Sequence, residues 1–323
     1  RTTTASLRVA PASASIHPSG DSLYPLKTRS LPHFTLLYMR ATEIFRFKVY
    51  RYAPWPLALL SGLSVAAETT AIRDESQPLQ LKYSVSLGVQ HRSVKVSDPT
   101  SPYRNRGTSV TAGLSRPIDN LTVAGLTLSY SLDHSGATNG TNNGKIEARS
   151  VSANLSRYIG GGRIVSATLG YGNSDLNNRA GTNYSADTDT LSGSIGIVQF
   201  IPFSENLAGS IGLSYGRVLN HIESYTNSAG TRVDGIAINS NALSLSGGLR
   251  WNLGPWTPSV NLGMSRASKK LSMSSSNHTA INYGFGLGYD LGNQRSLNIS
   301  YSSSLGLKNV RDNNLGASLS FPF

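Results

Sequence analysis

The stretch "INYGFGLGYDL", residues 281–291, decides the fold class because its apolar and polar residues alternate without a break. The odd positions hold Ile, Tyr, Phe, Leu, Tyr and Leu, whereas the even positions hold Asn, three Gly and Asp. Successive side chains of a β-strand point to opposite faces of the sheet, so this segment buries one face only. We therefore expect a strand with a wholly apolar face and a small, polar opposite face.

The same period-two pattern continues on both sides of this stretch and predicts twelve strands. "LKYSVSLGV" (81–89) and "SLNISYSSSL" (296–305) alternate in the same way. The expected strands lie near residues 80–95, 108–116, 121–134, 148–158, 163–174, 189–201, 207–222, 241–251, 257–268, 281–291, 296–306 and 315–323. Long connections such as "SGATNGTNNGKIE" (135–147) alternate with short ones such as "IGGG" (159–162). A meander of this kind places all of its long loops at one end.

Two all-β architectures can hold this many strands, a soluble sandwich and a membrane barrel. Greek-key crossings in a sandwich break the alternation of long and short connections. A transmembrane barrel produces that alternation, with apolar side chains toward lipid and polar ones toward the lumen, and it leaves no exposed strand edge. The sequence therefore predicts a closed antiparallel transmembrane β-barrel of about twelve strands over residues 79–323, with both of its ends in the periplasm.

The composition agrees with a barrel and excludes several other classes. Only 38% of the residues are hydrophobic and 14% are charged, and no run of 18 apolar residues exists. A bundle of membrane-spanning helices is therefore not expected. The absence of Cys excludes disulfides and thiolate metal sites. We expect no cofactor and no metal.

The region before the first strand has the order of a secretory signal. From Met39 a basic stretch precedes a short apolar segment, Trp55 to Val65, and then the small residues Ala66 and Ala67. Residues 39–67 are predicted to be a signal peptide cleaved after Ala67, with a basic leader of no targeting role as the alternative. Residues 1–38 are expected to be untranslated or a disordered extension, and residues 68–78 a short periplasmic or lumenal segment.

The leader also explains half of the net charge. The chain carries +12, but removing residues 1–67 leaves 21 basic and 15 acidic residues, a net charge of +6. A nucleic-acid partner is therefore not expected.

The last strand carries a resemblance to a known family. "LGASLSFPF" (315–323), which ends in Phe321-Pro322-Phe323, resembles the terminal signal by which the assembly machinery recognises bacterial outer-membrane barrels. Twelve strands of this style look like the β-domain of autotransporters, and "ALSLSGGLRWNLGPWTPSVNLGMS" (242–265) is similar to that family's paired strands. The resemblance covers about residues 80–323. It implies a bacterial outer-membrane location, with outer-membrane lipids, lipopolysaccharide and the barrel assembly machinery as partners.

The sequence departs from the family pattern before the barrel. An autotransporter carries a secreted passenger and a linker helix inside its pore, but here "ETTAIRDESQP" (68–78) alone follows the expected cleavage site. Eleven residues make about 16 Å of helix, roughly half of a bilayer core. The passenger therefore looks missing, and a translocator fragment whose passenger is encoded elsewhere is one alternative. The expected function is a membrane scaffold or pore for passive passage or surface display.

Three groups of residues are the candidates for such a function. The residues expected to line the lumen are Lys82, Ser84, Ser86, Arg250, Asn282 and Asp290. No ring of one charge sign is evident among them, so no ion selectivity is predicted. An aromatic girdle is expected from Trp251, Trp256, Tyr283 and Tyr289, although ordinary strand-favouring aromatics give the same pattern. Lys269 and Lys270 in a basic outer loop are candidates for contact with lipopolysaccharide phosphates, with plain solvation as the alternative.

One stretch allows an enzymatic alternative. His91 and Ser93 share a strand face, and Asn105 follows twelve residues after Ser93, where the chain could return beside them. This arrangement resembles the His-x-Ser plus Asn site of outer-membrane phospholipases A and would imply a lipid hydrolase. The family's Ser-Asn-Gly is here Ser93-Val94-Lys95, which departs from the pattern. We expect no enzyme and keep the hydrolase as the alternative.

Overall fold

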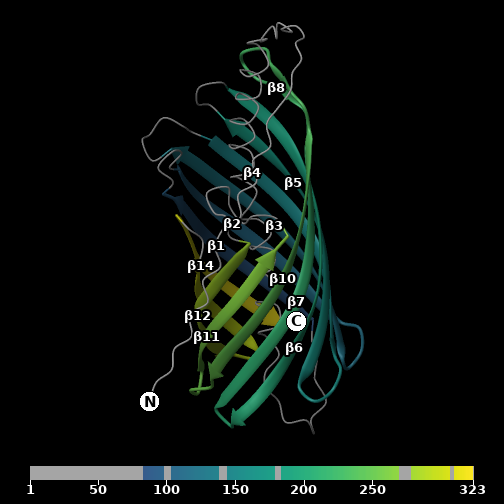
Figure 1. Ribbon diagram of the computed structural model, residues 1–323. Coiled ribbons are helices and arrows are strands. Elements are labelled where there is room, and N and C mark those ends of the chain that lie inside the picture. Colours follow the sequence, from purple (N-terminus) through teal and green to yellow (C-terminus); the bar gives the residue numbers. More distant parts are fainter. Residues whose placement is uncertain are drawn as a thin grey trace, which may run out of the picture. The chain divides into compact units, whose positions relative to one another are not determined.

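The computed structural model describes residues 83–97, 103–137, 144–178, 183–268, 278–305 and 309–322. Its twelve long strands form one closed antiparallel barrel in which neighbours in the chain are neighbours in the sheet (Figure 1). The last strand, β14, pairs with the first, β1, and closes the ring. The predicted fold class is confirmed. The expected signal peptide at 39–67 and the segment 68–78 lie outside the described residues.

The strands are long enough to extend beyond a membrane. The barrel strands are β1 Ser84–Val96, β2 Tyr103–Pro117, β3 Thr122–Ala137, β4 Gly144–Tyr158, β5 Arg163–Asn178, β6 Tyr184–Ser204, β7 Leu207–Ile222, β10 Ile236–Trp251, β11 Trp256–Ala267, β12 Thr279–Gly292, β13 Arg295–Leu305 and β14 Val310–Pro322. A small hairpin of β8 Tyr225–Thr226 and β9 Arg232–Val233 stands between β7 and β10. Among the described residues, no helix is long and apolar enough to cross a membrane.

The strand register sorts the side chains into an outward face and a lumen face. Residues of like character stand opposite each other across the strands, as Leu87 does with Leu319 on β14 and with Ala112 on β2. The outward face keeps large apolar side chains uncovered by protein; Leu169, Ile195 and Leu262 are 69%, 61% and 61% exposed. A contiguous apolar surface of this extent requires a cover, and lipid supplies one. The strands around the ring therefore share the pattern predicted for residues 281–291, with one apolar face that lipid covers and one small, polar face.

The short connections and the longer connections lie at opposite ends of the barrel. Five short connections (118–121, 159–162, 205–206, 252–255 and 293–294) lie at the end where β1 begins and β14 ends, here called the turn end. Asn293 and Gln294 have φ values of 52° and 61°, as a two-residue hairpin turn of type I′ requires. The remaining connections lie at the opposite end, called the loop end. From the asymmetry typical of outer-membrane barrels, we expect the turn end to face the periplasm.

At the loop end the strands are longer than the alternation predicts. β2 begins at Tyr103 rather than near residue 108, β10 at Ile236 rather than near 241, and β14 at Val310 rather than near 315. The outward residues there are polar because lipid no longer covers them, so the apolar pattern stops while the backbone hydrogen bonding continues. The loop-end connections are correspondingly shorter than expected.

Candidate functional site

Small polar residues and glycines make up much of the lumen face. Along β12, Gly284, Gly286 and Gly288 present no side chain to the lumen, and polar side chains of the neighbouring β11 lie over them. A Cβ atom at Gly284 would lie 2.6 Å from Asn261 Oδ1, and one at Gly286 would lie 2.5 Å from Ser259 Oγ. This part of the wall is therefore thin and offers hydroxyl and amide groups to the lumen.

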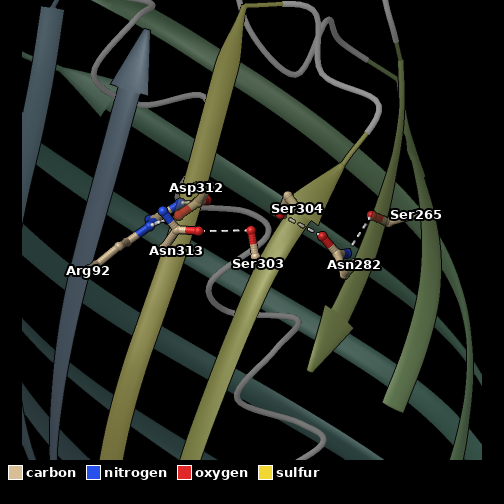
Figure 2. Close-up of polar contacts among 7 residues, drawn as sticks. All are labelled: Arg92, Ser265, Asn282, Ser303, Ser304, Asp312 and Asn313. Carbon is tan, nitrogen blue, oxygen red and sulfur yellow. Dashed lines mark hydrogen bonds and ion pairs between the residues drawn. The ribbon is translucent and has the colours of Figure 1, made fainter. Parts of the chain in front are cut away.

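The predicted lumen residues that the structure describes stand on the lumen-facing parity of their strands. Ser84, Ser86, Arg250, Asn282 and Asp290 occupy these positions, whereas Lys82 lies outside the described residues. Ser84 Oγ is 2.6 Å from Ser115 Oγ of β2. Asn282 accepts a hydrogen bond from Ser304 Oγ at 2.7 Å and donates one to Ser265 Oγ at 3.4 Å (Figure 2). These contacts link β11, β12 and β13 across the lumen wall.

An ion pair on the lumen face joins the first strand to the last. Arg92 donates from Nε and Nη2 to the two carboxylate oxygens of Asp312, at 3.0 and 2.5 Å (Figure 2). The side chains are 20% and 9% exposed, respectively. Two parallel hydrogen bonds of this kind fix the orientation of the guanidinium relative to the carboxylate as well as the distance between them. It therefore holds β1 against β14 at the point where the ring closes.

A second carboxylate lies beside this pair. Gly107 stands between Arg92 and Asp133 in the strand register. A Cβ atom at Gly107 would lie 1.2 Å from Asp133 Oδ1, so the carboxylate occupies the space that a side chain would fill. Asp133 therefore adds negative charge on the lumen face near the Arg92 guanidinium. Neither Arg92 nor Asp312 was among the predicted lumen residues, although the even parity of Arg92 in the first strand indicated its face.

At the loop end the inner side of β4 to β7 becomes apolar. Ile146, Leu176, Ala186, Ile222 and Tyr225 form one buried cluster, here called the apolar cluster. Tyr184, Val233 and Ile238 pack against it, and the rings of Tyr184 and Tyr225 stack with centroids 4.9 Å apart. Tyr225 and Val233 belong to the β8–β9 hairpin. The connection between β7 and β10 is thus packed onto the inner side of β4–β7.

The hairpin also carries its own local order. Asn227 Oδ1 accepts hydrogen bonds from the backbone N–H groups of Ala229 and Thr231, at 3.0 and 2.9 Å. The backbone N–H of Asn227 donates to Thr231 O at 3.0 Å. Such contacts from an Asn side chain satisfy backbone N–H groups that have no partner strand in a tight turn. The alternation pattern leaves residues 223–240 as a loop between the strands expected near 207–222 and 241–251, and it did not predict this hairpin.

The structure does not bring the three candidate hydrolase residues together. His91 and Ser93 are on the outward parity of β1, and His91 Nδ1 lies 3.2 Å from Thr108 Oγ1. Asn105 stands opposite Val94, which places it on the lumen parity of β2. A spacing of twelve residues brought the chain back beside Ser93, but Arg106 rather than Asn105 is the residue opposite it. The wall of the barrel therefore separates Asn105 from the His91–Ser93 pair.

The girdle and assembly candidates lie on the outward parity. Trp256 and Tyr289 stand opposite each other near the turn end with ring centroids 4.5 Å apart. Trp251 ends β10 at the same end, whereas Tyr283 lies further along β12 and makes an edge contact with Phe285. Phe321 stands opposite Val85 of β1, and Phe323 is outside the described residues. Their roles as girdle and assembly signal stay predictions.

The described residues hold no group of three or more His, Asp or Glu side chains placed to bind a metal ion. The two lipopolysaccharide candidates, Lys269 and Lys270, lie in the undescribed segment 269–277.

Comparison with known proteins identifies the fold. Residues 163–323 match the sequence family described as outer membrane protein beta-barrel domain. No curated protein gives a significant sequence match. The structure is similar to the translocator domain of the autotransporter NalP from Neisseria meningitidis, with a TM-score of 0.70 at 14% identity over 85% of this chain and 99% of that one.

Two further translocator structures are similar. The beta domain of the Bordetella autotransporter BrkA has a TM-score of 0.64 at 18% identity, over 75% of this chain and 100% of that one. The transport unit of AIDA-I from Escherichia coli has a TM-score of 0.56 at 12% identity, over 80% of this chain and 97% of that one. At these identities the similarity establishes a shared fold.

Proposed function

We propose that this protein, an autotransporter-like β-barrel of the bacterial outer membrane, is a membrane scaffold whose polar lumen gives small solutes a passive route. The observation that carries the proposal is the lumen wall of Ser, Thr, Asn and Gly. Twelve strands lie between the filled eight-stranded barrels and the open barrels of sixteen or more. Small side chains and glycines on the inner face leave the most room that a ring of this size allows.

The loop end sets how freely the route opens. The β8–β9 hairpin is anchored on the apolar cluster by Tyr225 and Val233. It therefore partly covers the outer mouth as long as the apolar cluster stays packed. Loosening the apolar cluster should widen the mouth without changing the lumen wall.

The proposal is tested by conductance in planar bilayers. The refolded protein should give small, steady single-channel currents, because the lumen wall is polar and carries few charges. The variant Tyr225→Ala should give larger or more strongly fluctuating currents, and Tyr171→Ala, on the lipid-facing side of β5, is the matched control. Silent, fully folded barrels in both the unmodified protein and Tyr225→Ala would refute the passive route.

The shared fold favours a second candidate, the passage of an extended polypeptide. A fold alone does not determine function, so this rests on a structural likeness. The chain contains no Cys, which makes the test direct. A single Cys placed at Ser259 on the lumen face should form a disulfide with a Cys in a transiting segment, whereas a Cys at Val260 on the outward face should not.

The proposal assigns no catalysis to the protein. His91 and Ser93 face outward and Asn105 faces the lumen, so no proton relay among the three is available in this arrangement. Phospholipid hydrolysis that disappears in Ser93→Ala would overturn this part.

The proposal also includes recognition of the last strand by the barrel assembly machinery. Phe321→Ala should weaken this recognition, and slower insertion of the variant into the membrane of cells would report it.

A further inference from the structure

Four cations gather on the outward face at the loop end, beside the seam where the ring closes. They are Lys95 of β1, Arg104 and Arg106 of β2, and Arg311 of β14, and all four are exposed. Together they are called the basic patch. Lys95 stands directly opposite Arg104 on one side and Arg311 on the other. Arg106 stands opposite His134, which in turn stands opposite Lys145.

This register is unfavourable in the isolated protein. Like charges directly opposite each other across strands destabilise a sheet. Among the described residues, no carboxylate forms an ion pair with any member of the basic patch. The nearby carboxylates of Asp133 and Asp312 are on the lumen face, and Glu147 pairs with Lys145. A ligand with negative charge would therefore remove a repulsion as well as form new contacts.

The height of the basic patch above the apolar band indicates where such a ligand lies. Arg106 is four residues beyond Val110, the last apolar outward residue of β2, and Lys95 is six beyond Val89 of β1. At ~3.3 Å per residue and a tilt of about 40°, they stand roughly 10 and 15 Å above the band. The headgroup layer extends about 5–8 Å beyond the hydrocarbon core, and long basic side chains reach several ångströms along the wall.

We propose that the basic patch binds the phosphate groups of lipopolysaccharide in the outer leaflet. Arg pairs with phosphate through two parallel hydrogen bonds, and Lys adds a point charge. Three adjacent strands present these groups side by side on the same outward face as the lipid-facing surface below them, so acyl chains and phosphates of one molecule contact one wall. This inference needs the outer-membrane location but not the passive route, so conductance results leave it unaffected.

The test compares two triple variants with the same change of net charge. The patch variant is Lys95→Gln, Arg104→Gln and Arg311→Gln. The control variant is Arg116→Gln, Arg163→Gln and Arg295→Gln, which removes three exposed cations at the turn end. Each refolded protein is incubated with phosphatidylcholine vesicles containing diphosphoryl lipid A or its dephosphorylated form, extracted in mild detergent and assayed for bound lipid A by native mass spectrometry.

The unmodified protein and the control variant should retain at least ten times more diphosphoryl than dephosphorylated lipid A. The patch variant should lose that preference. Inorganic phosphate at millimolar concentration should not displace the lipid, because it lacks the acyl chains that contact the wall. Equal retention in all proteins, or an equal loss in both variants, would overturn the proposal, and so would displacement by inorganic phosphate.

A second measurement separates binding from folding. Without lipid A, the patch variant should unfold at the same temperature as the unmodified protein or a higher one, because a repulsion is removed. With diphosphoryl lipid A, only the unmodified protein and the control variant should gain thermal stability. A patch variant that gains as much, or a change of oligomeric state in place of lipid A binding, would contradict the proposal.

Discussion

The loop end of this barrel has two walls that are stabilised in opposite ways. The seam wall, made of β14, β1, β2 and β3, holds the Arg92–Asp312 ion pair inside and the basic patch outside. The hairpin wall, made of β4 to β7, holds the apolar cluster inside and a row of carboxylates outside, where Glu147 stands opposite Asp175 and Asp175 opposite Asp187. Beyond the membrane, the same alternating strands therefore allow a charged pair on one inner wall, beside the buried Val94 and Val96 of β1, and an apolar cluster on the other.

The difference shows what lipid imposes and what it does not. Within the apolar band the outward residues are fixed by contact with lipid, so all twelve strands look alike. Beyond it each wall needs its own source of stability, because neither acyl chains nor a second protein layer cover it. We expect the apolar cluster to contribute more than the ion pair, since a charged pair also loses hydration when it forms.

The largest expected effect comes from truncating the apolar cluster. Leu176 is fully buried, and Leu176→Ala should lower the free energy of unfolding by about 2–4 kcal/mol through lost burial and the cavity left behind. Urea unfolding in lipid vesicles, followed by tryptophan fluorescence, measures it. Leu169→Ala on the lipid-facing side of the same strand is the control. An equal loss in both variants would mean that the hairpin wall has no separate interior.

Breaking the ion pair on the seam wall should have the next largest effect. Asp312→Ala leaves the Arg92 guanidinium without its carboxylate in a partly buried position, which should cost about 1–3 kcal/mol. A double-mutant cycle with Arg92→Ala isolates the coupling between the two side chains. A coupling energy indistinguishable from zero would show that backbone pairing alone closes the ring.

The exposed ion pair of Lys145 and Glu147, where the two walls meet, should contribute less to stability. Lys145 and Glu147 form an ion pair on the outward face of β4, with side chains 48% and 27% exposed. The coupling energy from a double-mutant cycle should be much smaller than that of Arg92 and Asp312 and should fall as salt is added, because water screens such pairs. A coupling as large as that of Arg92 and Asp312 would erase the contrast between buried and exposed charge.

The smallest effect is expected at the turn end, which both walls share. Asp119 accepts hydrogen bonds from the Leu121 N–H and the Thr122 hydroxyl, and these hold the pKa of its carboxyl below the usual value. Because the folded pKa is lowered, the stabilisation is present above the unfolded pKa near 3.9 and is lost as pH falls through the folded pKa. Urea unfolding from pH 2 to 6 should show this small loss, and Asp119→Asn should make the acid-dependent loss smaller by the share that Asp119 contributes. An unchanged loss in the variant would assign it to another group.

The sequence predicts those parts of the barrel that lipid determines. Alternation in residues 281–291 and its repeats gave the strand count, the two faces and the closed meander, because a lipid-facing strand must alternate. It did not predict where β2 begins, because Arg104 and Arg106 are outward residues that look like loop residues. The β8–β9 hairpin was missed because a strand of two residues, such as Tyr225–Thr226, is too short to show a period.

The site residues that were missed depend on register. Arg92 and Asp312 are 220 positions apart, and parity tells which face a residue occupies but not which residue stands opposite it. The same limitation explains Asn105, which a spacing of twelve placed near Ser93 although their faces differ. Register follows from turn geometry and from the closure of the whole ring, and a single sequence contains neither in readable form.

The pairing of β1 with β14 also sets the order in which the protein can form. Val96 pairs with Val310 and Ser84 with Pro322. The backbone N–H and C=O groups along one edge of the first strand therefore stay unpaired until the last strand is in place. Contacts between such distant parts of a chain are slow to form. A chain that lacks its final strand is consequently an open sheet whose free edges can pair with other chains. Pairing of the final strand with the first removes both edges and closes the barrel.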